Sequence, residues 1–518
     1  MAETVSQAGW VENFLQVALD SQNYYLISAG ATSILFRSMV GGVNDQSVLT
    51  YDPNLYRHWR VRHDQSSNAV SFETSADGDA WTTRKTATAA FSLTAVKFYL
   101  MAGAWGTGNG NPGAAKYDNF QFIASSTPLP PPSCTPPTSL IISEFRFRGS
   151  GGPADEFIEF YNNSDSAITV CTADQSSGWA LAARSADGTS ASTLFVIPAG
   201  TIIPGRGHFL AVNDSPDGYS LKDYAAGAGS NATGDLIYTG GIEDNSGIAL
   251  FKTSNSSNFT TANRLDAVGF TGSSGAIPDL YREGSGLNPI GSINGEYTFV
   301  RNIPNGSGGV PSDTNNNSSD FLFLSTNGGV FGGTASKLGA PGPENLFSPI
   351  VRSVMPLLFV DDTVTGSVPP NRVRDLTSDP ANNSTYGTLS IRRRVVNNTG
   401  TSVTRLRFRI TGITTFPVPS GTADMRARTS TAVTISNVND ANTCATLGTP
   451  SYPPCSVTVQ GTTLERPPGQ PSGGGYNSTL MVTLPQPLAA GASLNVQWLL
   501  GLQQTGSFQF FIIVEALP

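Results

Sequence analysis

Histidine is scarce in this chain, with three residues among 518. Acid–base and metal chemistry near neutral pH draws heavily on histidine, so little material is available for either. His208 has no His, Cys or carboxylate partner at metal-binding spacing, and we expect it to start a strand. The chain also lacks GxSxG, HExxH and P-loop motifs, and no GxGxxG lies between a strand and a helix. We therefore predict that the protein is not an enzyme and needs no cofactor.

Charge is also sparse. Only 13% of the residues are charged, the formal net charge is −8 and the pI is about 5.0. Phosphate binding needs a basic footprint, so this balance argues against nucleic acid as a partner. No run of about 18 apolar residues is present, which predicts no membrane span. The opening MAETVSQAG has neither the basic start nor the apolar core of a signal peptide, so an exported form would have its signal outside this sequence.

Glycine and proline are abundant instead, at 55 and 34 residues. Outside the first 25 residues no stretch has a convincing helical period. Short strands joined by many turns fit this composition, so we predict an all-β protein of tandem β-sandwiches. The length suggests about three domains. We place them at 1–124, 138–346 and 347–518, with the proline-rich segment 125–137 as an extended linker.

The stretch from Leu140 to Ser164, LIISEFRFRGSGGPADEFIEFYNNS, predicts strand, turn and strand. Apolar and polar residues alternate up to Arg148, which is typical of a half-buried strand. Glycines and Pro153 then allow a tight reversal, and a second strand follows at Phe157 to Tyr161.

This stretch closely resembles the opening strands of the lamin tail domain, an immunoglobulin-like β-sandwich found in nuclear lamins and in many secreted bacterial proteins. The resemblance covers about 136 to 346, with long insertions. Further pieces match in order: IPAGTIIPGRGHFLAVND (Ile197–Asp214), GIALFK (Gly247–Lys252), LDAVGF (Leu265–Phe270) and GAPGPEN (Gly339–Asn345). The family implies a binding or structural module and brings no catalytic residue.

The first domain shows alternating strands around polar turns, from Arg57 to Ala87 and from Ala95 to Trp105, with a last strand in AKYDNFQF. WRVRHD, VSFETSADGDAW and YDNFQF resemble the concanavalin A-like lectin/glucanase jelly roll. The domain is short for that family, and we expect its usual opening strands to be missing. The paired-glutamate motif ExDxxE of the hydrolases is absent, and Glu73 stands alone on its strand, so the resemblance favours a lectin-like or structural role over hydrolysis.

Several residues of this domain are candidate ligand contacts. Aromatic side chains could stack on sugars, although packing in the core is the alternative. Two turn aspartates could bind Ca²⁺ through oxygen ligands, although a plain β-turn also explains them. The stacking candidates are Trp59, Trp81, Trp105 and Tyr117, and the calcium candidates are Asp77 and Asp79.

The four cysteines suggest two local disulfides. Cys444 and Cys455 flank a short loop, whereas Cys134 and Cys171 bracket the first two strands of the lamin-tail-like region. Metal-binding spacing such as CxxC is absent, so disulfides are favoured over buried thiols. Disulfides would place the protein in an oxidising compartment, outside the cell or at its surface.

In the third domain, strands at Tyr386–Gly400 and Thr401–Ile413 predict a hairpin with its tip at 397–400. Period-two arginines would share sheet faces and form a basic stripe for an acidic partner such as sulfated or uronic polysaccharide. The alternative is a solvated face that pairs with local acids such as Asp361, Asp362 and Asp375. The arginines of the stripe are Arg392, Arg394, Arg405, Arg407 and Arg409.

The last strand, near Phe508 to Ile513, is apolar on both faces, so it is either central in a sheet or covered by another chain. This end of the chain is similar to the Ig-like β-sandwich module that ends some bacterial surface proteins carrying lamin tail domains.

These observations favour a secreted or cell-surface structural or adhesive protein that associates with itself or with other surface proteins. One specific form is a subunit of an extracellular filament, assembled through incomplete sheet edges. A carbohydrate-binding protein is the alternative, and a glycoside hydrolase relative is a third possibility.

Overall fold

The structure is a computed structural model. It describes residues 2–4, 11–30, 32–64, 68–78, 80–91, 93, 96–104, 115–117, 139–185, 190–223, 232–271, 279–415, 421–446, 452–465 and 474–517. They confirm the predicted all-β fold of tandem β-sandwiches.

Helices are few and short in the described residues, and none of them is long and apolar enough to cross a membrane. The α-helices are α1 (Asn317–Asp320) and α2 (Ala441–Ala445). The 3₁₀ helices are η1 (Ser220–Asp223), η2 (Ser256–Asn258), η3 (Asp279–Tyr281) and η4 (Pro380–Asn382).

The chain divides into two compact units, Met1–Leu129 and Pro130–Pro518. The division falls inside the predicted linker 125–137, whose own residues lie outside the described ranges. The second unit contains two sandwiches, here called the second and third sandwiches, each with its own apolar core.

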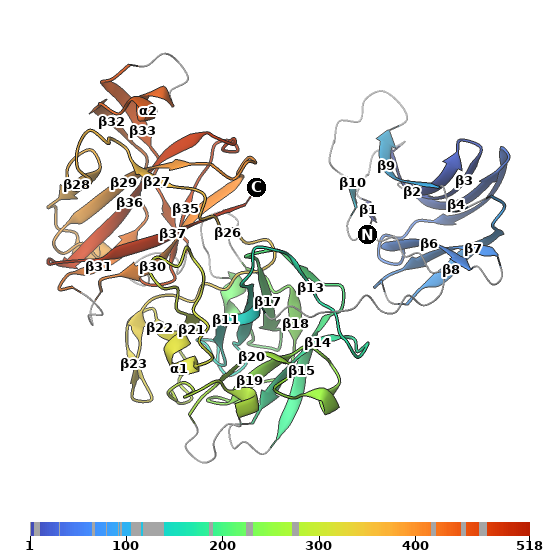
Figure 1. The fold of residues 1–518 in the computed structure, drawn as a ribbon, viewed down its shortest axis with the longest axis horizontal. Helices are drawn as coiled ribbons and strands as arrows, with labels where there is room; N and C mark the ends of the chain where they lie inside the picture. The colour runs from blue at the N-terminus through green and yellow to red at the C-terminus, as the bar shows by residue number, and fades with distance from the viewer. Residues whose placement is uncertain are drawn as a thin grey trace. The chain divides into compact units, whose positions relative to one another are not determined.

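The first unit packs a five-stranded antiparallel sheet, β5-β4-β3-β2-β9, against a three-stranded sheet, β6-β7-β8 (Figure 1). Tyr25, Phe36 and Phe72 are fully buried between the sheets, with Phe72 in edge contact with both other rings. The strands are β1 (Ala2–Thr4), β2 (Val11–Asp20), β3 (Asn23–Ala29), β4 (Ser33–Val40), β5 (Val43–Thr50), β6 (His58–Asp64), β7 (Ala69–Ser75), β8 (Thr82–Thr88), β9 (Lys97–Ala104) and β10 (Ala115–Tyr117).

Strands β6 to β9 confirm those predicted over Arg57–Ala87 and Ala95–Trp105. The expectation that the first domain lacks opening strands is wrong, because β2 to β5 precede Arg57 and form most of its larger sheet. Strand β5 has no clear alternation because seven of its eight residues are exposed, so its two faces do not differ.

The second sandwich encloses Trp179, Phe145 and Phe160 between a seven-stranded sheet, β18-β17-β12-β11-β21-β22-β25, and a four-stranded sheet, β15-β14-β19-β20. The strands of the larger sheet are β11 (Leu140–Arg146), β12 (Phe157–Asn162), β17 (His208–Asn213), β18 (Leu236–Tyr238), β21 (Tyr297–Arg301), β22 (Phe321–Ser325) and β25 (Lys337–Leu338). The others are β13 (Ile168–Thr169), β14 (Gly178–Arg184), β15 (Ala191–Pro198), β16 (Ile202–Ile203), β19 (Gly247–Phe251), β20 (Arg264–Gly269), β23 (Val330–Phe331) and β24 (Thr334–Ala335).

Strands β11 and β12 confirm the strand, turn and strand predicted over Leu140 to Ser164. The prediction that the first of them is half-buried is wrong, because all seven residues of β11 are buried. Glu144 and Arg146 are polar members of the alternation, yet they are 1% and 0% exposed. Both are buried because other segments cover the outer face of the sheet and supply partners for their charges.

The third sandwich packs sheet β26-β37-β30-β35-β34 on sheet β27-β29-β36-β31, with β28 also paired to β29. Trp498 and Phe408 meet edge to face in its core. Its strands are β26 (Ile350–Val351), β27 (Leu357–Phe359), β28 (Arg372–Asp375), β29 (Thr388–Val396), β30 (Arg405–Ile413), β31 (Asp424–Arg428), β34 (Thr463–Leu464), β35 (Thr479–Val482), β36 (Ser493–Gln504) and β37 (Phe510–Leu517), and β32 (Val433–Val438) pairs with β33 (Cys455–Val459) in a separate hairpin.

The hairpin predicted across 386–413 is wrong. Its two strands exist as β29 and β30, but they belong to opposite sheets of the sandwich. The turn at 397–400 therefore carries the chain from one sheet to the other. The final strand β37 lies between β26 and β30, but β26 pairs only with Glu515 and Ala516. The apolar residues 510–513 pair with β30 alone and are partly exposed, so the predicted central position does not hold for the apolar part of the strand.

Candidate functional site

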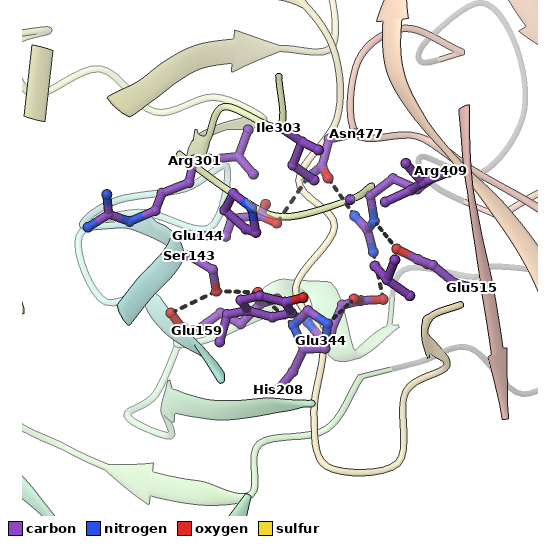
Figure 2. A pocket seen from close by; sticks show the side chains of 16 residues that line it. Ser143, Glu144, Glu159, His208, Arg301, Ile303, Glu344, Arg409, Asn477 and Glu515 are labelled. Carbon is purple, nitrogen blue, oxygen red and sulfur yellow. Dashed lines mark hydrogen bonds and ion pairs between the residues drawn. The ribbon is translucent and has the colours of Figure 1, made fainter. Parts of the chain in front are cut away.

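A buried group of polar side chains lies where the second and third sandwiches meet (Figure 2). We call it the inter-sandwich ion cluster. None of its members is more than 8% exposed, although most are ionisable. The second sandwich and the segment that leaves it supply Glu144, Glu159, His208 and Glu344, and the third sandwich supplies Arg407, Arg409, Asn477 and Glu515.

The register of the third sandwich explains how its charges reach this place. On β30, Leu406 and Phe408 point into the apolar core, so Arg407 and Arg409 share the opposite face. Glu515 of β37 lies directly across from Arg407 in the sheet. One acid therefore stands beside two arginines on a face that the second sandwich covers.

The segment after β25, GAPGPEN, links the two sandwiches. The backbone N–H of Gly342 donates to Glu144 Oε1 at 2.8 Å, and that of Glu344 donates to Glu159 Oε2 at 2.6 Å. A side chain on Gly342 would meet Asn477 and Arg409 atoms at about 3 Å, so only glycine fits here without a shift. The close approach of this segment to the third sandwich thus depends on a glycine.

The charged side chains form a series of ion pairs that share carboxylates. Arg407 Nε donates to Glu515 Oε2 at 2.5 Å, and Arg409 Nε donates to Glu515 Oε1 at 2.7 Å. Arg409 Nη2 lies 2.6 Å from Glu344 Oε1, and Arg407 pairs with the same oxygen. Glu344 thereby receives two guanidinium groups from the other sandwich.

His208 extends this series of ion pairs on the side of the second sandwich. Its Nδ1 lies 3.0 Å from Glu159 Oε1 and its Nε2 lies 2.8 Å from Glu344 Oε2. Ser143 Oγ also donates to Glu159 Oε1, at 2.5 Å. His208 does begin β17, as predicted, but its carboxylate partners come from segments far away in the sequence.

Asn477 closes the group on the opposite side. Its Nδ2 donates to Glu144 Oε2 at 3.0 Å and to the carbonyl of Ala340 at 3.1 Å, while its Oδ1 accepts from Arg409 Nη1 at 2.5 Å. A single amide thus connects an acid of the second sandwich to an arginine of the third.

The pKa values of two acids in the cluster are shifted in opposite directions. Burial, followed by the charge of Glu159, raises the pKa of Glu144 to about 7. Burial would also raise the pKa of Glu515, but Arg407 and Arg409 outweigh it and hold that pKa below its ordinary value. The cluster therefore contains one firmly ionised acid and one that takes up a proton near neutrality.

The cluster lines a cavity of about 40 Å³. A buried water needs roughly 10 to 15 Å³ by this measure, so the space suits a few water molecules. Ligand pockets are about ten times larger. The geometry therefore suits a polar joint between two sandwiches better than a substrate site.

The structure does not bring the predicted arginine stripe together. Arg407 and Arg409 belong to the ion cluster, and Arg405 begins the same strand. Arg392 and Arg394 lie on β29 in the opposite sheet, so the prediction of one shared face is wrong. Of the acids predicted as local partners, Asp362 interacts electrostatically with Arg394. Asp440, which the sequence did not suggest, also interacts with Arg394.

The aromatic candidates of the first unit are engaged in its own structure. The indole N–H of Trp59 donates to the carbonyl of Tyr56 at 2.7 Å, and the ring packs on the core. The indole of Trp81 donates to Gly78 at 2.8 Å and carries the Arg60 guanidinium 4.1 Å from its ring. Trp105 lies outside the described residues, and Tyr117 is in β10 without a described side chain.

The acids of the first unit are also engaged. Glu73 is 3% exposed and pairs with Arg60 at 2.6 Å and Arg62 at 3.2 Å. Asp77 Oδ1 accepts from Ser75 Oγ at 2.8 Å and from the N–H of Ala80 at 2.9 Å, which are bonds of a turn. Asp79, the other calcium candidate, lies outside the described residues.

A second acidic group lies in the second sandwich. Carboxylate oxygens of Asp266, Glu283 and Asp313 lie within 4.8 Å of one another, which is a spacing that a metal ion can bridge. Two of these acids already form salt bridges: Arg301 Nη2 lies 2.7 Å from Asp266, and Arg264 Nη2 lies 3.0 Å from Glu283.

The cysteines support the predicted disulfides in part. Cys444 and Cys455 form a disulfide that ties α2 to β33. Cys171 is also disulfide-bonded. Cys134, its predicted partner, lies outside the described residues.

Sequence reasoning missed the acids that build the ion cluster. Glu159, Glu344 and Glu515 lie far apart in the chain and no motif connects them. The available signal is weak: Glu144 and Arg407 sit at polar positions of alternating strands, where exposure to solvent is the ordinary expectation.

Comparisons with known proteins identify no relative, since no family model, curated protein or solved structure matches this chain. The resemblances to the lamin tail domain and to the concanavalin A-like fold therefore rest on the quoted motifs alone.

Proposed function

We propose that this chain is a non-catalytic structural or adhesive protein of the cell surface or extracellular space, and that it associates with copies of itself through strand β5. The proposal rests on the exposure of this strand and on its position at the edge of its sheet. Seven of its eight residues are exposed, and β4 is its only partner among the described strands. A regular, unpaired sheet edge is a template on which another chain can add a strand.

The side chains of β5 support pairing with another strand. Val43, Val48 and Leu49 are 71%, 52% and 37% exposed. The strand contains no proline, and its one charged residue, Asp45, pairs with Lys85 of the same unit at 2.7 Å. Proline, bulges and free lysines are the usual protections of an edge, and β5 has none of them.

The direction of the strands favours a dimer as the first product. All neighbours in this sheet are antiparallel, so its two edge strands, β5 and β9, run the same way. Head-to-tail addition would pair β5 with β9 of the next copy in parallel, whereas a two-fold axis pairs β5 with β5 in antiparallel fashion. Antiparallel pairs are about two to three times as common. A filament would then need a second contact elsewhere on the chain.

Three further features support the proposal. The inter-sandwich ion cluster joins two sandwiches around a cavity of about 40 Å³. The disulfide between Cys444 and Cys455 fits an oxidising compartment, where such bonds persist. The motifs that resemble a lamin tail domain point the same way, because that family supplies binding and structural modules.

Sedimentation velocity over a range of concentrations tests the proposal on the full chain. We expect reversible dimers that Val48→Lys abolishes, because a lysine on an edge strand opposes pairing. The matched control is Val330→Lys, which adds the same charge at a 67% exposed position of β23 in the second unit and should leave association unchanged. A wild-type chain that stays monomeric up to high concentration, or a V48K chain that dimerises as the wild type does, would contradict the proposal.

A further inference from the structure

Two arginines lie at the margin of the third sandwich, in the same sheet. Arg372 of β28 pairs with Ile391 of β29, whose side chain belongs to the apolar core. Directly opposed residues share a face, and so do residues two positions apart on one strand. Arg372 and Arg393 therefore both point to the core side of their sheet. We call them the rim arginines.

Aromatic rings flank both groups. The guanidinium carbon of Arg372 lies 5.6 Å from the ring centre of Phe508, which precedes β37 of the facing sheet. That of Arg393 lies 4.8 Å from the ring centre of Phe359 on β27. The contact with Phe508 places Arg372 toward the facing sheet, whereas Arg393 lies beside Phe359, its cross-strand neighbour in the same sheet. Both arginines are only partly exposed.

In the part of the chain that the structure describes, no carboxylate pairs with a rim arginine, whereas Arg426 and Arg428 of β31 pair with Asp424 and Asp379. The Nε of Arg372 is buried without a hydrogen-bond acceptor. Arg393 Nη1 donates to the carbonyl of Arg392 at 2.7 Å, which satisfies one of its five N–H groups.

The two positive charges also act on each other. Burial, followed by the charge of Arg372, lowers the pKa of Arg393. Arginine stays protonated at any physiological pH, so proton loss does not relieve this repulsion. An anion placed between the groups would relieve it and would satisfy the N–H groups that lack acceptors.

We propose that Arg372 and Arg393 form a binding site for a compact anionic group, such as a carboxylate, sulfate or phosphate. Guanidinium groups bind such oxyanions through paired, charge-assisted hydrogen bonds. Phe359 is 38% exposed and both rim arginines are partly exposed, so the anion can be free or can project from a larger acidic molecule. This site is independent of the self-association proposed for β5.

Binding is tested on the full chain with three probes: inorganic sulfate, dextran sulfate and neutral dextran. Isothermal titration calorimetry at low ionic strength gives the affinities. We expect the wild type to bind both sulfated probes and to ignore neutral dextran. A preference for the polymer identifies an acidic macromolecule as the source of the anion, and equal affinity per sulfate identifies a free ion.

The variant Arg372→Gln/Arg393→Gln should bind sulfate roughly tenfold or more weakly, because each charge-assisted hydrogen bond contributes about that factor. Arg426→Gln is the matched control, since it removes a positive charge from the same sheet at a residue already paired with Asp424. It should bind within about twofold of the wild type.

Arg393→Lys keeps the charge and loses the planar fork, and it should also weaken binding. Far-UV circular dichroism shows whether the double variant folds, and if it does not, Arg393→Lys replaces it in the binding measurement. Three results would overturn the proposal: no anion binding by the wild type, unchanged binding in the rim variants, or an equal loss in Arg426→Gln.

Discussion

Two pairs of arginines in the third sandwich differ in their burial and in their carboxylate partners. Arg407 and Arg409 on β30 are buried and share carboxylates from two sandwiches. Arg372 and Arg393, in the opposite sheet, are partly exposed and have no carboxylate partner among the described residues. The first pair joins two sandwiches, and the second is the proposed anion site. The difference shows that the role of a strand arginine is set by what covers its face of the sheet.

The largest expected effect comes from removing the acid that β30 depends on. Glu515→Gln removes one of the two carboxylates that Arg407 and Arg409 share and leaves Glu344 as the other. Breaking a buried ion pair costs about 3 to 5 kcal/mol, so we expect a loss of that size in the free energy of unfolding of the second unit. Urea denaturation, followed by tryptophan fluorescence of the buried Trp498, measures it.

The matched change at the rim should be small. Arg393→Gln removes a charge that has no acidic partner and is repelled by Arg372, so the free energy of unfolding should stay within about 0.5 kcal/mol of the wild type. Equal losses for Glu515→Gln and Arg393→Gln would show that the two pairs of arginines do not differ as described.

Glu144→Gln should change the free energy of unfolding somewhat less than Glu515→Gln does, and its effect depends on pH. The pKa of this acid is raised in the folded state to about 7 from an ordinary value of 4.5. The folded state therefore holds a proton that the unfolded chain releases, and this part of the stability is lost as pH rises from about 4.5 to about 7. Glu144→Gln cannot titrate, so its stability relative to the wild type should rise by about 2 to 3 kcal/mol over that interval.

Urea denaturation of both chains at several pH values checks this expectation, with the exposed Glu243→Gln as control. A difference between wild type and Glu144→Gln that stays constant from pH 4.5 to pH 7.5 would mean that Glu144 does not hold its proton in the folded state.

Local sequence patterns predicted much of the fold. The β11–β12 motif, the strands around the Asp77 turn and the final strand all have alternation or apolar runs bounded by turn residues. These signals are local, so neighbouring residues suffice to reveal them.

Strand pairing and the site were not predictable in the same way. Strands β29 and β30 follow each other closely, which suggests a hairpin, yet each finds its partners in distant strands of a separate sheet. The polar face of β30 has the pattern of a solvated surface. That face is buried only because the second sandwich and Glu344 cover it, and no property of β30 itself reveals a partner so far along the chain.

The buried charges join the second and third sandwiches. A double-mutant cycle with Glu344→Gln and Arg409→Gln measures this coupling, because these side chains lie 2.6 Å apart and come from opposite sides of the joint. We expect a coupling free energy of roughly 1 to 3 kcal/mol from urea denaturation of the four chains. Strictly additive effects of the two substitutions would contradict it.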